Sequence, residues 1–393
     1  MADENKTVIE VADTLSNVSA SQWDACANPN DKVYDPFISY DFLQSLEKSE
    51  AVHPRTGWQP QHLLLKSEGG ELKACMPLYC KSHSKGEYVS DYGWAEAFER
   101  AGGHYYPKLV SAVPFTPVPG RRLLVRPGLN CTQHEKLLML GAIELMRRYD
   151  MSSLHINFLP AAQWNNSAKN GFLQRTDQQF HWQNQNYSTF NDFLSELASR
   201  KRKTMRKERS QALTEGIEIE WISGTDITEE HWDAIYMFYM DTGSRKWGHP
   251  YLNREFFSLL GATLADKCLL IMALKDGRYI AGALNMIGGD CLYGRYWGAT
   301  EHHPCLHFEV CYYQAIDYAI QHGLNRVEAG AQGEHKLTRG YMPTPTYSAH
   351  YIAHPSFRRA IASYLENERA YIEKTREALS CYGPYRAAAN ETE

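Results

Sequence analysis

The sequence predicts an α/β protein made of two similar domains that are joined by a basic helical segment. The chain has 393 residues, and a domain of ordinary size takes about 150. The same order of helix, hairpin strands, central strand, helix and strand can be read in each half. A run rich in lysine and arginine lies between the halves. We therefore expect domains at residues 1–190 and 217–393, linked by a helix at 191–216.

Helix and strand patterns follow one another through the first half. Apolar residues at helical spacing predict helices, and short apolar runs between glycine or proline turns predict strands. The expected elements are a helix that includes 42–46, strands at 62–66 and 72–79 that form a hairpin, a strand at 108–113, a helix at 134–149 and a strand at 153–158.

The second half repeats this order. The expected elements are helices at 229–241 and 254–265, consecutive strands at 268–274, 279–287 and 291–297, a helix at 307–321 and a strand at 326–329. Glycines punctuate this half: Gly277 lies in a hairpin turn and Gly323 ends the helix that precedes the last strand.

One long helix is expected between the halves, from residue 190 to residue 215. Seven of the ten residues at 200–209 are basic, and such a run repels itself, so an anionic ligand would stabilise it. The phosphates of an acyl donor would supply that charge. The alternative is a solvated helix face. The expected phosphate contacts are Lys203, Arg206 and Lys207.

Composition indicates a globular protein and excludes several functional classes. Hydrophobic residues make up 43% and charged residues 22%, which is ordinary for a chain that buries its own core. The 41 Lys+Arg against 46 Asp+Glu give a net charge of −5, which argues against a DNA-binding protein. No apolar run reaches the roughly 18 residues of a membrane helix. The nine cysteines form no CxxC pair, so we expect reduced thiols and a cytoplasmic location, without a membrane span.

Several segments resemble the FemABX-type acyltransferases, which are tandem-domain members of the GNAT superfamily. The inter-domain region of that family is similar to the run RKRKTMRKERSQALTEGIEI. Its second domain is similar to LYGRYWGATEHHPCLHFEVCYYQAIDYAIQHGLNRVEAG followed by EHKLTRGY, and its opening to DPFISYDFLQSLE followed by GWQPQHLLLK. The chain most resembles the FemAB-like group of N-acyltransferases of peptidoglycan biosynthesis or recognition. The resemblance implies tandem GNAT-like domains, α/β (α+β) in class, and acyl transfer.

The resemblance leaves the acyl donor open. GNAT enzymes bind the coenzyme A pyrophosphate on an Arg/Gln-x-x-Gly-x-Gly/Ala loop, and residues 297–304 do not form that motif. The donor is then acyl-CoA, acyl carrier protein or aminoacyl-tRNA, used as a co-substrate, and no cofactor is expected to be bound permanently. The mild negative net charge and the lack of an added tRNA-binding arm favour a thioester. The acceptor is an amine-bearing small molecule or peptide.

A general base must remove a proton from the acceptor amine during the attack. Glu309 begins the helix after the central strand and Glu328 ends the next strand. Glu334 and His335 stand in a glycine-interrupted run that suits a site better than a core, and we favour these two. No cysteine or serine has a convincing base partner, so we expect direct attack without a covalent enzyme intermediate.

Other residues are expected to bind the donor and the substrate. Gly120, Arg121 and Arg122 form a turn whose amides and guanidinium groups could cradle a phosphate; a surface loop is the alternative. Arg245 and Trp247 lie in a polar loop that could hold a carboxylate or phosphate.

The central strand carries Arg295 and Tyr296. In a GNAT-type mechanism a backbone N–H of this strand stabilises the oxyanion of the tetrahedral intermediate. A structural salt bridge is the alternative for Arg295. The resemblance implies that the family's terminal basic-Gly-aromatic segment contacts substrate, and here that segment supplies Lys336, Arg339 and Tyr341.

Other functions stay open. A non-catalytic module could use the same fold to recognise a cell-envelope precursor or peptide. A metal hydrolase would need ligands such as His302, His303, Cys305 and His307. Those residues are crowded just before a helix, whereas zinc sites usually take ligands from two separated pairs, so no metal is expected.

Overall fold

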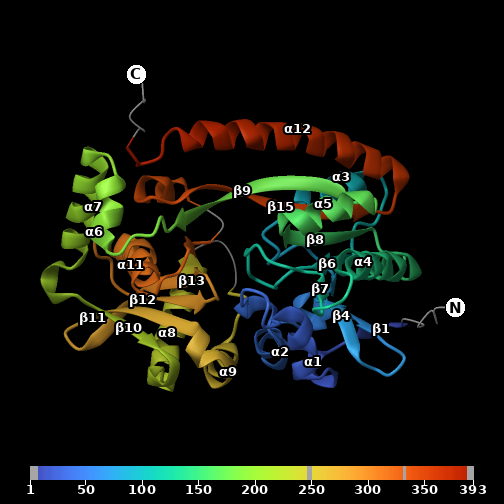
Figure 1. Ribbon diagram of the computed structural model, residues 1–393, viewed down its shortest axis with the longest axis horizontal. Helices are drawn as coiled ribbons and strands as arrows, with labels where there is room; N and C mark the ends of the chain where they lie inside the picture. The colour runs from blue at the N-terminus through green and yellow to red at the C-terminus, as the bar shows by residue number, and fades with distance from the viewer. Residues whose placement is uncertain (1–7, 246–249, 331–332, 387–393) are drawn as a thin grey trace. The chain divides into compact units, whose positions relative to one another are not determined.

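The computed structural model describes residues 8–245, 250–330 and 333–386. The chain divides into two compact units (Figure 1). Unit 1 comprises residues 1–177 and 345–373, and unit 2 comprises residues 178–344 and 374–393. The segment expected to link two domains, residues 191–216, belongs to unit 2.

Unit 1 contains two sheets and their covering helices. Its elements are β1 (Val8–Ala12), α1 (Ala20–Ala27), α2 (Tyr40–Lys48), β2 (Trp58–Pro60), β3 (His62–Lys66), β4 (Leu72–Met76), β5 (Tyr79–Lys81), α3 (Tyr92–Arg100), β6 (Lys108–Ser111), β7 (Leu124–Val125), α4 (Cys131–Arg148), β8 (Ser153–Leu159) and α5 (Ala161–Lys169). The strand orders are β1-β3-β4-β7 and, with β15 (Met342–Ile352), β15-β8-β6-β5-β2.

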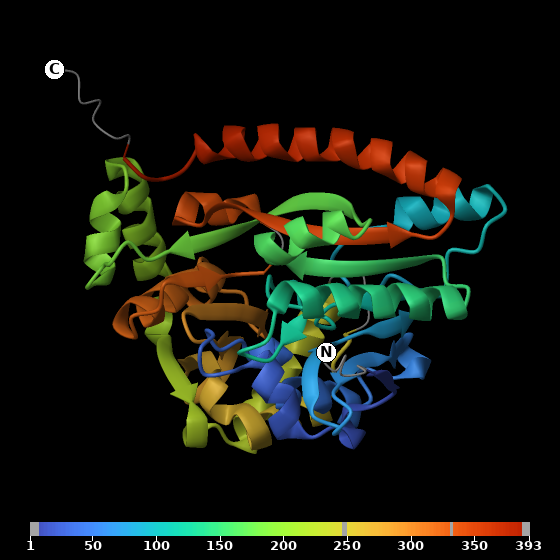
Figure 2. The same ribbon diagram turned by 45° about the vertical axis from the view of Figure 1, so that its right-hand side comes forward.

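The core of unit 1 forms where α4 packs against the sheet. Leu138, Met139 and Met146 of α4 are buried, and they belong to the same apolar cluster as Leu154 and Ile156 of β8. Figure 2 shows α4 lying along β8. Helix α12 (Pro355–Ser380) starts in this unit, and its first part lies beside α3 in both views (Figures 1 and 2).

A fully buried lysine organises one end of β6. The Lys108 ammonium donates to Glu87 Oε2 at 2.8 Å, to Asp91 Oδ2 at 2.5 Å and to Ser84 Oγ at 2.8 Å. Asp91 also accepts from the Tyr105 hydroxyl at 2.6 Å. Burial raises the pKa of Glu87 to about 7 although Lys108 opposes the shift. Burial would also raise the pKa of Asp91, but the Lys108 ammonium keeps it well below its usual value. The lysine is therefore the charge that makes two buried carboxyl groups tolerable.

Unit 2 is a single sheet with helices on it. Its elements are α6 (Phe190–Glu196), α7 (Ser199–Ala212), β10 (Glu218–Ser223), α8 (Glu229–Arg245), α9 (Arg254–Leu264), β11 (Cys268–Lys275), β12 (Arg278–Ile287), β13 (Cys291–Ala299), α10 (Leu306–Phe308), α11 (Gln314–Gln321) and β14 (Arg326–Glu328), with a π-helical turn at Glu309–Tyr313 and a short 3₁₀ helix at Glu334–Arg339. Together with β9 (Leu173–Gln183), the strand order is β10-β11-β12-β13-β14-β9.

Most of the elements expected from the sequence are present within a few residues of their predicted bounds. The single long helix from residue 190 to residue 215 is wrong, because the chain leaves the helix after Glu196. Leu197 takes an extended conformation, is fully buried and forms a β-bridge with Tyr385. The N–H of Ala198 donates to Pro384 O at 2.9 Å, after which α7 begins. Burial of one leucine thus divides the basic helix from α6.

A glycine brings α8 into direct contact with β13. A Cβ atom placed on Gly298 would lie 2.0 Å from the Phe238 carbonyl oxygen of α8. No larger residue fits unless the backbone moves.

None of the helices in residues 8–245, 250–330 and 333–386 combines the length and the apolar character that a membrane-spanning helix requires.

Gly298→Ala should destabilise the protein by about 3 kcal/mol, since the added methyl group meets backbone rather than a movable side chain. Gly93→Ala is the matched control: it lies on a helix, and nothing lies within 4 Å of the added carbon. Chemical unfolding followed by circular dichroism measures both. Equal stability of the two variants would contradict the close approach of α8 to β13.

Lys108→Met should destabilise the protein by about 3–5 kcal/mol, because two buried carboxyl groups lose their counter-charge. The raised pKa of Glu87 means that stability falls as pH rises through about 7, and removal of Lys108 steepens that fall. The difference between the wild type and the variant should therefore grow from about pH 5 to about pH 9. Lys85→Met, at an exposed position in the same unit, should show no such trend in unfolding experiments.

Candidate active site

Strands β13 and β14 of unit 2 run together for three residues and then separate. Their parallel pairing joins residues 291–293 to residues 326–328. Strand β14 ends at Glu328, whereas β13 continues to Ala299 with β12 on its other side. Among the described strands, none pairs with the β14 side of β13 beyond Tyr293. A strand edge without a partner strand can offer its backbone N–H groups to a ligand.

A β-bulge lies at the start of the free edge. In the pairing of β12 with β13, Asn285 faces Gly294 and Leu284 faces Tyr296, so Arg295 is the extra residue. A bulge turns one side chain away from the regular alternation, and bulges often lie beside active sites. The Arg295 guanidinium lies 5.3 Å from the centre of the Tyr296 ring, and that ring packs 5.0 Å from Tyr239 of α8. The two predicted substrate residues of β13 are thus half-buried at the bulge.

Buried polar side chains surround the end of β14. Glu328 Oε1 accepts from Arg326 Nε at 3.1 Å, while Glu328 Oε2 has no hydrogen-bond partner in the part of the chain that the structure describes. His181 of β9 lies 3.9 Å from that oxygen. Burial lowers the pKa of His181, although the neighbouring Glu328 raises it. Lys336 is buried as well, and its ammonium donates to Gly330 O at 2.9 Å. Glu328 therefore keeps one buried carboxylate oxygen, 3.9 Å from His181, that has no hydrogen bond among the described residues.

His335 of the 3₁₀ helix after β14 and Tyr312 of the π-helical turn after β13 form a hydrogen-bonded pair. Their Nε2 and hydroxyl oxygen are 2.8 Å apart. Burial raises the pKa of Tyr312 above its usual range. The phenol is therefore protonated, and its O–H can donate a hydrogen bond to the imidazole. The His307 ring lies 5.3 Å from Tyr312, 6.1 Å from His335 and 5.2 Å from Trp297 of β13. Through His307, the pair is connected to the free edge of β13.

A pocket of about 380 Å³ opens at the end of β13. It is lined by Thr242, Trp297, Ala299, Glu301, His302, His303, Cys305, Leu306, His307 and Phe308. His303 Nε2 lies 3.0 Å from Glu301 Oε2, and this contact joins two residues of the loop between β13 and α10. No group of three or more potential metal ligands occurs among residues 8–245, 250–330 and 333–386.

Arg339 and Tyr341 fix the positions of the backbone segments that carry His335 and Tyr312. One nitrogen of Arg339 donates to both oxygens of Glu208, at 2.9 and 3.0 Å. Another donates to the His335 carbonyl oxygen at 2.7 Å. Tyr341 is fully buried, and its hydroxyl donates to Tyr312 O at 3.3 Å. Both residues support the His335–Tyr312 pair.

The basic face of α7 forms a second pocket of about 380 Å³. It is lined by Arg200, Lys201, Thr204, Met205, Glu208, Tyr313, Thr338 and Arg339. The residues expected to bind phosphate, Lys203, Arg206 and Lys207, are exposed and do not line it. A basic run in a sequence does not fix the rotation of its helix, which the packing of buried Met205 determines here. Arg200 and Lys201 line the pocket and were not among the residues expected from the sequence.

Glu309 is buried in an ion pair. Its carboxylate accepts from Arg209 Nε at 3.1 Å and from Gln314 Nε2 at 2.7 Å. Arg209 also pairs with Asp317. With both oxygens engaged and no exposure, Glu309 is placed to stabilise the fold. Glu334, in contrast, is exposed at the start of the 3₁₀ helix.

The predicted phosphate cradle in unit 1 is occupied by the protein itself. Arg121 donates to the carbonyl oxygens of Cys26 and Ala27. Arg122 is fully buried and donates to Val118 O at 2.6 Å. The Gly120 N–H donates to a backbone oxygen of β8. These groups stabilise a loop, and they are not part of the candidate site.

The polar loop expected to bind substrate begins where α8 ends, at Arg245, and Trp247 lies outside the described residues.

Three comparisons with known proteins bear on this site. A model of the FemAB-like family, described as peptidoglycan biosynthesis/recognition, matches residues 14–387. No curated protein sequence matches the chain. Among solved structures, FemX is 12% identical with a TM-score of 0.54, over 91% of this chain and 100% of FemX.

Two further solved structures have the same fold. L-PGS from Bacillus licheniformis is 9% identical with a TM-score of 0.51, over 85% of this chain and 98% of that one. A conserved protein of unknown function from Bacteroides thetaiotaomicron is 10% identical with a TM-score of 0.51, over 88% and 100%. At these identities the likeness concerns the fold alone, and it agrees with the predicted α/β class.

Glu309→Ala should destabilise the protein by about 3 kcal/mol, because the partly buried Arg209 loses its main counter-charge. Glu334→Ala removes an exposed carboxylate and should change stability by less than about 0.5 kcal/mol. Urea unfolding followed by tryptophan fluorescence compares the two. An unchanged midpoint for Glu309→Ala would contradict its structural role.

Proposed function

The chain belongs to the FemAB-like family of acyltransferases, and we propose that unit 2 transfers an acyl or aminoacyl group to a primary amine at the opening between β13 and β14. The separation of these strands after Tyr293 is the observation that carries the proposal. An activated carbonyl that enters the opening meets the backbone N–H groups of β13. These groups would stabilise the oxyanion that forms when the amine attacks.

In the proposed reaction, the amine nitrogen bonds to the carbonyl carbon and the thioester or ester bond of the donor then breaks. The Tyr312 hydroxyl oxygen accepts the proton of the attacking amine while its own proton passes to His335 Nε2, 2.8 Å away. The imidazole proton then goes to the thiol or hydroxyl group that leaves the donor. Glu328 Oε2, which is buried at the end of β14 and has no hydrogen bond among the described residues, is proposed as the second proton acceptor. Arg339 positions His335 through its carbonyl oxygen.

The acyl donor is proposed to carry phosphates, which the basic pocket on α7 would bind. Arg200, Lys201 and Arg339 supply positive charge there, and only Glu208 among the lining residues is acidic. Acyl-CoA, acyl carrier protein and aminoacyl-tRNA all fit this requirement. The family description supports an amine-bearing peptidoglycan precursor or peptide as the acceptor.

Donor binding tests the basic pocket. The full chain is titrated with acetyl-CoA and with aminoacyl-tRNA, and Kd is measured by fluorescence anisotropy or calorimetry. The double variant Arg200→Ala/Lys201→Ala should weaken the donor about ten-fold, as expected for lost charge-assisted hydrogen bonds. Lys203→Ala/Arg206→Ala removes the same charge from the other side of α7 and should change Kd less than about two-fold. Equal losses in the two double variants would contradict the assignment of the pocket.

Turnover tests the proton acceptor. His335→Gln should lower kcat by at least about 100-fold, the usual contribution of a general base, while donor Kd stays unchanged. Glu334→Gln, at the neighbouring exposed residue, is the control and should keep full activity. Mass spectrometry of the acylated amine provides the readout. If the wild type binds donor and acceptor but forms no product, the chain is a recognition module and the proposed transfer is wrong.

A further inference from the structure

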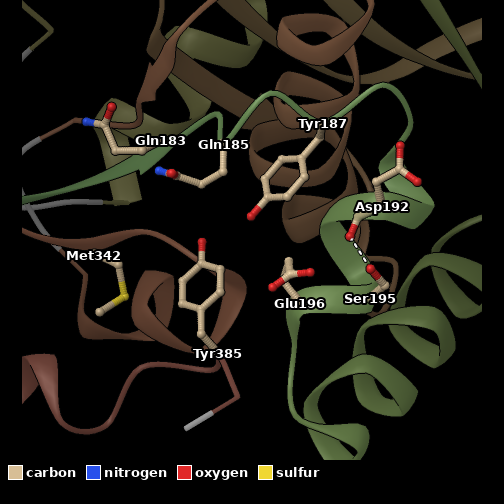
Figure 3. A pocket seen from close by; sticks show the side chains of 8 residues that line it. All are labelled: Gln183, Gln185, Tyr187, Asp192, Ser195, Glu196, Met342 and Tyr385. Atoms are coloured by element: carbon tan, nitrogen blue, oxygen red, sulfur yellow. Dashed lines mark hydrogen bonds between the residues drawn. The ribbon is translucent and has the colours of Figure 1, made fainter. Parts of the chain in front are cut away.

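Unit 2 contains a third pocket, larger than the two described above, and none of the residues that line it belongs to the proposed reaction site. Its volume is about 640 Å³. The end of β9 and the loop after it contribute Gln183, Gln185 and Tyr187, helix α6 contributes Glu196, and the segment after α12 contributes Tyr385. Figure 3 shows the Tyr187 and Tyr385 hydroxyl groups pointing into the same open space, with the Glu196 carboxylate close to it.

The walls of this pocket are fixed by backbone hydrogen bonds. The N–H of Arg386 donates to Glu196 O at 3.0 Å, and the N–H of Ala198 donates to Pro384 O at 2.9 Å. These bonds fasten the chain around Tyr385 to the end of α6. The Tyr385 hydroxyl donates to Gly340 O at 2.9 Å, which holds its ring in place and leaves its oxygen able to accept.

The described walls of the pocket carry negative charge. They are formed by Gln183, Gln185, Tyr187, Asp192, Ser195, Glu196, Met342 and Tyr385. None of these described residues is a lysine, arginine or histidine. Asp192 is already engaged, because its carboxylate accepts from the N–H groups of Ser188 and Thr189. Within the described chain, no hydrogen bond or ion pair reaches the Glu196 carboxylate. Burial and, next, the charge of Glu196 raise the pKa of Tyr187, which places that charge beside the Tyr187 phenol.

The remaining polar groups are acceptors or can act as acceptors. Glutamine carbonyl oxygens, phenol oxygens and a carboxylate can together take several N–H donors, and an aromatic face favours a cation. A calcium ion needs about six to eight oxygen ligands, usually with several carboxylates among them, whereas Glu196 is the one carboxylate of this pocket without a hydrogen bond among the described residues. An ammonium group on a flexible chain, with three donors and one positive charge, matches this set better.

We propose that this pocket binds a primary alkylammonium group, with Glu196 as the counter-charge and Tyr187, Tyr385 and Gln185 as hydrogen-bond acceptors. The chemical class is that of a lysine side chain or a linear amine. The proposal does not depend on acyl transfer, because none of these residues belongs to the proposed reaction site.

The first test uses the wild-type full chain and three probes of equal length: 1-aminopentane, 1-pentanol and pentanoate. Ligand-observed NMR at low ionic strength should detect binding of 1-aminopentane, and calorimetry should give its Kd. Pentanol and pentanoate should bind at least ten-fold more weakly. Equal binding of pentanol would overturn the proposal, because the pocket would then recognise only an apolar chain. Absence of 1-aminopentane binding would overturn it too.

The second test compares matched carboxylates in the same unit. Glu196→Gln should raise the Kd of 1-aminopentane about ten-fold, as expected when a charge-assisted hydrogen bond is lost. Glu218→Gln, an exposed carboxylate of β10, should change it less than about two-fold. Tyr187→Phe keeps the ring and should weaken binding a few-fold. Equal effects of Glu196→Gln and Glu218→Gln would overturn the proposal, and the wild-type probes decide the question if a variant fails to fold.

Discussion

The candidate site depends on two parallel strands that stay paired for only three residues. Residues 291–293 and 326–328 are held together by the sheet, and beyond them β13 keeps its partner β12 while β14 ends. The bulge at Arg295 and the close approach of α8 at Gly298 fix the path of the free edge. Within the described chain, no strand pairs with this edge beyond Tyr293, and preorganised backbone N–H donors at such an edge would stabilise developing charge effectively.

Most charged residues near this edge serve the structure. Glu309 neutralises Arg209, Glu208 holds Arg339, and Arg326 is shared by Asp290 and Glu328. Each pair fixes one helix or loop, so few side chains are left for chemistry. His335 with Tyr312, the buried Oε2 of Glu328, and Arg200 with Lys201 are the described groups to which the proposal gives chemical roles. The function proposed for unit 2 rests on that small set.

Local patterns were enough to predict much of the fold. The hairpin of β3 and β4, helix α4, and the run from β11 to β13 have clear periodicity, and they lie where the sequence placed them. Helix α12 was missed because its surface is largely polar, with only Ile361 and Leu365 buried. The site was harder to predict, since a basic run does not reveal which side of a helix faces a pocket. Arg121 and Arg122 looked available in the sequence but donate to carbonyl groups of their own unit.

Hydrogen exchange of the full chain with and without bound donor tests the central claim most directly. If the donor carbonyl lies against the free edge of β13, the amides of residues 294–299 should exchange more slowly in the complex. The amides of β10, at the far edge of the same sheet, should exchange at an unchanged rate. A donor that binds tightly while exchange at 294–299 stays the same would contradict the account.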